Sequence, residues 1–183
     1  MHWVTTRIIH FDRVASAWLI SRFIDPEASF DFIEPGAEFP AGATTFSVAG
    51  GDIGRHDKDG TTFSKLIKRH KLVDPALQEL ERVVVAGVAY VMEGRQPRAD
   101  DRPAWIAVGL LAVAEGLLAL EETDADILAK SLPVWDAVYA EAGLRALRRA
   151  PPGAAGDGDA LLGTKFAMTL ARLRQAPGRA RRR

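Results

Sequence analysis

Asp52 and His56 form the residue pair in this sequence that is best suited to chemistry. If the segment 53–57 is an extended strand, alternate side chains lie on one face, so this carboxylate and this imidazole point the same way. Together they supply two ligands of a facial site for a divalent iron, manganese or zinc ion. The spacing carries no fixed signature, and a surface histidine beside a turn is the alternative interpretation.

A third ligand for such a site would have to come from elsewhere in the chain, and Glu115 and Asp136 are the candidates. Both lie among apolar neighbours in segments that we expect to be helical. A buried carboxylate is costly unless it is paired or bound to a cation. We therefore expect each of them either to neutralise Arg13 or Arg22 or to bind the metal ion.

An amphipathic helix from Asp12 to Ile24 is expected to carry an acid and both of these arginines. Asp12 stands where an N-cap belongs, because its carboxylate can accept a backbone N–H of the first turn. Apolar residues at roughly helical spacing follow, and Pro26 ends the helix. Arg13 and Arg22 are nine positions apart, a spacing that allows them to align on one side without requiring it.

The elements that must position these residues divide the chain into an early part rich in strands and a later part rich in helices. Short runs of β-branched and aromatic residues between turn signals predict the strands. Capping residues and proline at the first turn predict the helix starts. The expected strands are 3–10, 29–33, 45–48 and 53–57, and the later helices are 62–70, 74–93, 101–121, 124–149 with a kink or break at Pro133, and 161–175.

This order predicts an α+β fold, with a small N-terminal β-sheet and one early helix packed on a mostly helical C-terminal half. We expect residues 3–149 to form one domain and residues 150–183 to form a linker, a short helix and a basic tail. A chain of 183 residues can bury a sizeable core without cross-links.

Composition excludes several chemistries. The chain has no cysteine, so thiolate catalysis, disulfides and cysteine-bound metal sites are ruled out. It has no phosphate-binding glycine loop and no nucleophile elbow. No signal peptide is visible, so the cytoplasm is the expected location. The apolar run 104–120 is slightly short for a membrane span and contains Glu115, which favours a core helix and no membrane association.

The C-terminal end is strongly basic. No acidic residue follows Asp159, whereas seven lysines and arginines do, and the rest of the chain balances them to a net charge of zero. Such a tail could bind nucleic acid, but a solvated terminus explains it as well. No aromatic residue follows Phe166, so bases would have no stacking platform there. A nucleic-acid partner is therefore not favoured.

The N-terminal motif and several shorter pieces together resemble the chromate-resistance ChrB C-terminal domain family. The resemblance covers about residues 3–142, and its most specific part is the N-terminal motif. Its elements are a threonine-bearing strand, Asp12-Arg13, Trp18 to Pro26, Ala28 to Phe30, Gly54 to His56, Thr62-Phe63, Asp74 to Leu77, Gly109 to Ala112 and Val134 to Tyr139.

The resemblance implies a role in chromate response or tolerance. We expect the domain to exert it by binding a metal ion or a small oxyanion in a polar cleft. Chromate is a dianion, and Arg13, Arg22 and Arg55 could donate charge-assisted hydrogen bonds to it. The candidate site-lining residues are Asp12, Arg13, Arg22 and Tyr139, and the candidate metal ligands are Asp52, His56, Glu115 and Asp136.

Two questions stay open from the sequence. The same acidic and histidine ligands would also suit a small metalloenzyme that handles electrons or oxygen, with iron, manganese or zinc as its cofactor. The family tends to show an aspartate near the end of an apolar run, where this chain reads Val83 to Met92 without one. If that aspartate helps to bind a metal ion in the family, this chain would bind the ion differently or not at all. The oligomeric state is not predicted.

Overall fold

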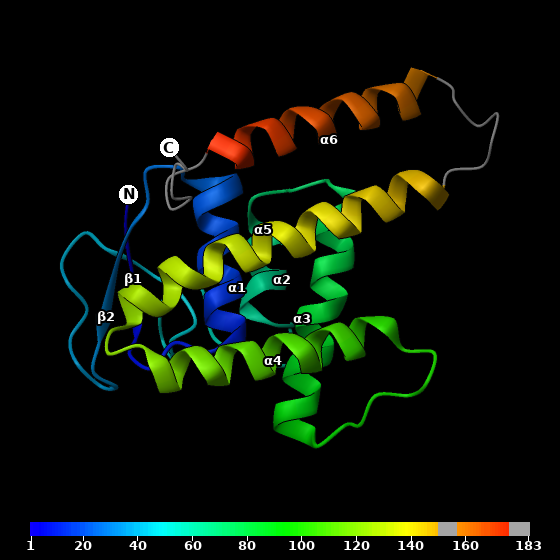
Figure 1. The fold of residues 1–183 in the computed structure, drawn as a ribbon. Coiled ribbons are helices and arrows are strands. Elements are labelled where there is room, and N and C mark those ends of the chain that lie inside the picture. The colour runs from blue at the N-terminus through cyan, green and yellow to red at the C-terminus, as the bar shows by residue number, and fades with distance from the viewer. Residues whose placement is uncertain (150–156, 176–183) are drawn as a thin grey trace.

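The computed structural model describes residues 1–149 and 157–175. A small parallel sheet and one early helix occupy the N-terminal part, and long helices form the rest (Figure 1). This arrangement confirms the predicted α+β fold. The expected linker and the end of the basic tail, residues 150–156 and 176–183, lie outside the described residues.

The sheet has three strands in the order β2-β1-β3. They are β1 (His2–Thr6), β2 (Ser29–Ile33) and β3 (Thr44–Thr45). Both neighbours run parallel to the central strand, with Trp3 opposite Phe30 and Val4 opposite Thr45. Parallel neighbours require a crossover, which α1 supplies between β1 and β2.

Two strands end earlier than the sequence suggested. The chain leaves β1 after Thr6, because Ile8 has a left-handed backbone with φ of 59°. Ser47 has φ of 55°, which ends the extended run after β3. The segment 53–57 is not a continuous strand, since Ile53 pairs with Phe46 through one isolated bridge. The β propensity of the side chains predicted longer strands than the structure has, because the backbone turns away at the carboxyl end of each strand.

The early helix begins one residue before the predicted start. It comprises α1 (Phe11–Leu19) and a π-helical turn, η1 (Ile20–Ile24). Its N-cap is His10, which makes no side-chain capping bond, so the prediction that Asp12 caps this helix was wrong. Asp12 lies inside the first turn, where its carboxylate is free to bind another element.

The sequence indicates Thr61 or Thr62 as the cap of the next helix and Asp74 as the cap of the one after it, and the structure shows Thr61 and Asp74 in these roles. In α2 (Thr62–Arg69) the Thr61 side chain accepts the Ser64 N–H. In α3 (Pro75–Glu93) the Asp74 carboxylate accepts the N–H groups of Ala76 and Leu77. Such caps satisfy N–H groups that have no partner within the helix.

Three more helices follow: α4 (Arg102–Leu120), α5 (Asp124–Arg149) and α6 (Asp157–Gln175). Pro133 lies inside α5 without dividing it. Only 22% of the most apolar window of α4 is buried. The expectation of a core helix was therefore wrong: α4 lies along the outside of the helical half, with one face on α3 (Figure 1).

A cluster of aromatic side chains joins the sheet half to the helical half. The Trp18 ring on α1 lies 6.4 Å from Trp135 and 5.8 Å from Tyr139, both on α5, measured between ring centroids. Phe11 contacts Trp135 in the same way, at 5.7 Å. These large rings are fully or almost fully buried, so they contribute much of the apolar burial that holds α1 against α5.

Candidate functional site

A polar cleft of about 220 Å³ lies between the segments that follow β1 and β3. The chain leaves the carboxyl end of the central strand through α1 and returns as β2 on one side, whereas β3 lies on the other side. Ligands of open parallel sheets bind at such a switch point, outside the carboxyl ends of the strands. The lining residues that carry polar side chains are His10, Asp12, Arg13, Ser47, Arg55 and His56.

The loop between β1 and α1 is held from both sides. Asp124, the first residue of α5, accepts the N–H of Ile8 at 3.1 Å and the N–H of Ile9 at 2.7 Å. Arg13 Nη1 donates to the carbonyl oxygens of Arg7 and Ile8, at 3.3 and 3.0 Å. A β-branched residue in the left-handed region persists only where its surroundings over-determine it. These four bonds do so for Ile8.

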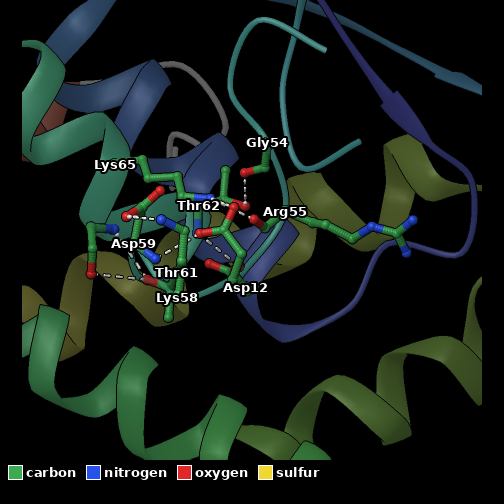
Figure 2. A network of polar contacts seen from close by, with 10 residues as sticks. Asp12, Gly54, Arg55, Lys58, Asp59, Thr61, Thr62 and Lys65 are labelled. Carbon is green, nitrogen blue, oxygen red and sulfur yellow. Dashed lines mark hydrogen bonds and ion pairs between the residues drawn. The ribbon is translucent and has the colours of Figure 1, made fainter. Parts of the chain in front are cut away.

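Arg13 and Arg55 bring two positive charges to the cleft. The pKa of Arg13 is lowered, mainly by burial, while Asp12 and Asp124 act in the opposite direction and the charge of Arg55 adds to the lowering. A guanidinium has five N–H donors, and both bonds of Arg13 to the loop start from one nitrogen. Arg55 is an exposed residue, and Figure 2 shows its side chain extended away from the loop network. Donors are therefore present for an anion in the cleft.

Asp12 caps a helix other than its own. Its carboxylate oxygens accept the N–H groups of Thr62 and Phe63, the first two residues of α2, at 3.2 and 3.3 Å (Figure 2). Burial nevertheless raises the pKa of Asp12, although these bonds and the nearby His56 oppose the shift. The carboxylate of Asp12 thus interacts with the N-terminus of α2, whose dipole favours an anion.

Two histidines complete the polar wall. His10 and His56 both line the cleft. The pKa of His10 is lowered mainly by burial, with Glu115 opposing the shift and Arg13 adding to it. Glu115 is therefore close enough to act electrostatically, although it is an exposed residue of α4 and does not line the cleft.

The opposite wall of the cleft is apolar. It is formed by Gly87, Val88, Val91 and Met92 on α3. A Cβ at Gly87 would lie only 2.2 Å from Cε1 of Phe11, so glycine is what lets α3 approach the start of α1. Neutral side chains on this wall leave the positive charges of the other wall unopposed from that side.

The comparison with known proteins identifies the family at this point. A family model described as the C-terminal domain of ChrB matches residues 3–142. The chain belongs to the ChrB C-terminal domain family.

This ChrB C-terminal domain is also similar to the protein ChrB of Cupriavidus metallidurans strain CH34, with 41% identity over 64 residues. That stretch is 35% of this chain and 17% of the relative's length. No solved structure matches the chain.

The cleft contains only some of the residues that the sequence suggested for this ChrB domain. Asp12, Arg13 and His56 line it together. Arg22 and Asp136 instead form a buried ion pair, with Nε 3.0 Å from Oδ1, and Trp18 Nε1 donates to the same oxygen at 2.8 Å. Of the two roles that the sequence left open for Asp136, pairing with an arginine and binding a metal ion, the structure shows the pairing, and its partner is Arg22.

Tyr139 and Asp52 also lie apart from the cleft lining. The Tyr139 hydroxyl donates to Asp74 Oδ2 at 2.7 Å, which ties α5 to the start of α3, and burial followed by the charge of Asp74 raises the pKa of this phenol strongly. Asp52 accepts both the N–H and the hydroxyl of Thr45 at 2.8 Å, and these bonds lower the pKa of Asp52. Its carboxylate closes the turn after β3.

Within residues 1–149 and 157–175, no group of three or more histidine, aspartate or glutamate side chains is arranged to hold a metal ion. The cleft instead combines two guanidinium groups, two imidazoles and one carboxylate that is engaged with α2. This donor set fits an anion better than a divalent cation.

Sequence reasoning did not place His10 or Asp124 among the site residues. His10 follows β1 directly, and the position of a polar residue at the carboxyl end of a strand was the available signal. Asp124 was noted only as the start of a helix, and nothing in its local sequence indicates that it binds a loop more than one hundred residues earlier.

Proposed function

We propose that this ChrB C-terminal domain takes part in chromate resistance by binding a small tetrahedral oxyanion, chromate itself, in the cleft at the ends of β1 and β3. The observation that carries the proposal is the pair Arg13 and Arg55, which line one small cleft at the switch point of the sheet. A cleft of about 220 Å³ is several times the roughly 30 Å³ share of one water, so it has room for a hydrated ion.

The hydrogen-bond donors that line the cleft support an anion. Two arginines and one carboxylate line it, and that carboxylate accepts two backbone N–H groups of α2. Asp124 and Glu115 act on Arg13 and His10 from outside the lining. Guanidinium groups make short, charge-assisted hydrogen bonds to oxyanions. An anion would also favour the protonated form of His10, so we expect affinity to rise as the pH falls below the ordinary histidine range.

The test is isothermal titration of the purified chain with chromate, sulfate and phosphate. Wild type should bind chromate, and Arg55→Gln should weaken binding about ten-fold or more, because one charge-assisted hydrogen bond contributes about 1.5–3 kcal/mol. Arg98→Gln is the matched control, since Arg98 is an exposed arginine outside the cleft and its variant should bind like wild type.

The competing function is a metalloenzyme or metal sensor built on His56, the one candidate metal ligand from the sequence that lines the cleft. Titration with manganese, zinc and ferrous iron decides between the two. Stoichiometric binding of one of these ions that disappears in His56→Ala, together with no oxyanion binding, would replace the proposal. Equal chromate binding by Arg55→Gln and Arg98→Gln would also contradict it.

A further inference from the structure

Helix α4 is apolar on both of its faces, although only one face is buried. Its most apolar window has a mean hydropathy of 1.9, and among the described residues it is the one helix that passes the length and hydropathy test for a membrane span. Ala104, Ala107, Leu110 and Leu111 face the rest of the bundle and are buried. A helix that is apolar all round is normally covered on every side.

The uncovered face forms a continuous apolar stripe. The stripe runs from Trp105 to Leu120. At 100° per residue, the exposed residues that form it fall within about one third of the helix circumference, opposite the buried positions. Trp105 is 52% exposed, Val113 44% and Leu120 77%. No charged residue lies inside the stripe, and the exposed Glu115 borders it. We define the α4 stripe as Trp105, Gly109, Ala112, Val113, Gly116, Ala119 and Leu120.

Trp105 presents an exposed ring that is suited to a contact with another protein. Its indole N–H donates to the carbonyl oxygen of Arg98 at 2.9 Å, so its one polar atom is satisfied within the chain. What remains exposed is therefore an apolar ring in a fixed position. Fixed, half-buried aromatic side chains of this kind are the anchors of protein interfaces.

We propose that the α4 stripe is covered by the same stripe of a second copy of this chain, with the two helices antiparallel about a two-fold axis between Ala112 and Val113. In this register Gly109 of one copy faces Gly116 of the other, and Trp105 faces Leu120. The stripe is therefore complementary to itself, as an isologous contact requires. The Trp105 ring of one copy and the Leu120 side chain of the other meet at the two ends of the contact. Between these ends, the two helix backbones approach each other at Gly109 and Gly116.

The two glycines support this register independently. A Cβ at Gly109 or at Gly116 would meet nothing within 4 Å, so the fold of one chain gives no reason for glycine at either position. Glycine inside a helix is unfavourable relative to alanine. It is useful where another backbone comes close, which the antiparallel pairing places at both positions.

The area of the stripe sets the expected strength of the contact. A stripe one third of the circumference wide along the 16 residues from Trp105 to Leu120 covers about 300 Å² per copy. This is comparable to the largest apolar patch on many monomers and less than half of what a standard interface buries per partner, so the contact is expected to be weak. We therefore expect a dimer that forms in the micromolar range.

A bilayer fits the same surface less well. The buried face of α4 already packs on α3, and Glu115 adjoins the exposed face. The basic segment 176–183 of the same chain is not a suitable occupant of the α4 stripe either. Its only apolar residues are alanine and proline, so it cannot supply a matching apolar surface. A second copy supplies the same apolar stripe in the right register.

Sedimentation equilibrium of the full chain between about 1 and 200 µM, a range that brackets a micromolar dissociation constant, tests the proposal. Wild type should approach twice its 19.9 kDa mass as the concentration rises. Gly116→Leu should raise the dimer dissociation constant at least ten-fold while thermal unfolding of the dilute monomer is unchanged or occurs at a higher temperature. Ala137→Leu adds a comparable bulk to an exposed position of α5 outside the stripe, and this control should dimerise like wild type.

Three results would overturn the proposal. The first is a monomer at every concentration. The second is a dimer that Gly116→Leu and Trp105→Ser leave intact. The third is flotation of the monomeric chain with vesicles of phosphatidylcholine and phosphatidylglycerol, abolished by Trp105→Ser, which would assign the stripe to a membrane surface.

Discussion

Asp124 Oδ2 at the start of α5 lies 3.1 Å from the backbone nitrogen of Ile8, at the turn that follows β1. The other oxygen of the same carboxylate accepts the N–H of Ile9 at 2.7 Å. One side chain from the helical half thus fixes the loop that places Arg13 in the cleft. The cleft depends on the packing of both halves.

Replacing Asp124 by alanine should destabilise the protein and weaken oxyanion binding. The N–H groups of Ile8, which is exposed, and of Ile9 would lose their acceptor, which costs about 0.5–1.5 kcal/mol of unfolding free energy for each hydrogen bond. Urea unfolding and titration with chromate measure the two effects. Asp126→Ala removes the same charge from the same helix turn without touching the loop, and it should leave chromate affinity unchanged. Equal chromate affinity in wild type and Asp124→Ala would show that the loop keeps its shape without this contact.

Replacing Ile8 by asparagine should stabilise the protein by about 1 kcal/mol, because the substitution relieves a backbone conformation that β-branched residues disfavour. Ile8 has φ of 59° and is 69% exposed, so little packing is removed. Val73 is also an exposed β-branched residue, at 89%, but it lacks a positive φ. Val73→Asn is the control and should not stabilise. Thermal unfolding of both variants is the measurement, and an Ile8→Asn variant less stable than wild type contradicts the argument.

Replacing Asp12 by asparagine should change how stability depends on pH. Burial raises the native pKa of Asp12 above the ordinary value of 3.8, so the folded state holds this proton more tightly than the unfolded chain. The resulting stabilisation is complete below the ordinary pKa and is lost as the pH rises through the raised native pKa. The asparagine side chain cannot titrate, so the stability of wild type relative to the variant should decline as the pH rises from the ordinary pKa of 3.8 through the raised native pKa. Urea unfolding at several pH values measures this difference, and a constant difference would show that the native pKa is not raised.

Removing one partner of the Arg22–Asp136 pair should cost far more than removing one partner of a surface pair. The two side chains are only 5% and 1% exposed, so Asp136→Ala leaves an uncompensated guanidinium in the core, at a cost of about 3–5 kcal/mol. Arg7 and Glu34 form an exposed pair, and Glu34→Ala should cost at most about 1 kcal/mol. Denaturant unfolding compares them. Similar losses in the two variants would mean that water reaches the inner pair.

Local signals in the sequence were sufficient for most elements and insufficient for the cleft. Thr61 and Asp74 were recognisable as caps because a cap binds within its own helix turn. Asp12 looked like a cap of the same kind, but its carboxylate binds α2, about fifty residues away. Only the packing of α1 against α2 determines that choice.

The candidate site residues fall into two groups for a similar reason: those whose need for a partner the sequence indicates, and those whose partners depend on the fold. The cost of a buried charge indicated from the sequence that Asp136 needs a cationic partner, and it left Arg13, Arg22 and a metal ion open; the structure shows Arg22. Which acids and bases share the cleft depends instead on the order of the strands, and the parallel order β2-β1-β3 was not evident from the sequence. Asp52 therefore looked like a partner of His56, whereas its carboxylate binds Thr45.

Three contacts that α5 makes with the earlier chain have a consequence for the exchange of gene fragments. Asp124, Asp136 and Tyr139 reach back to the loop after β1, to α1 and to the start of α3, and all three lie before residue 142, where the family match ends. A gene fragment exchanged between proteins would have to include this portion of α5 to transfer an intact cleft.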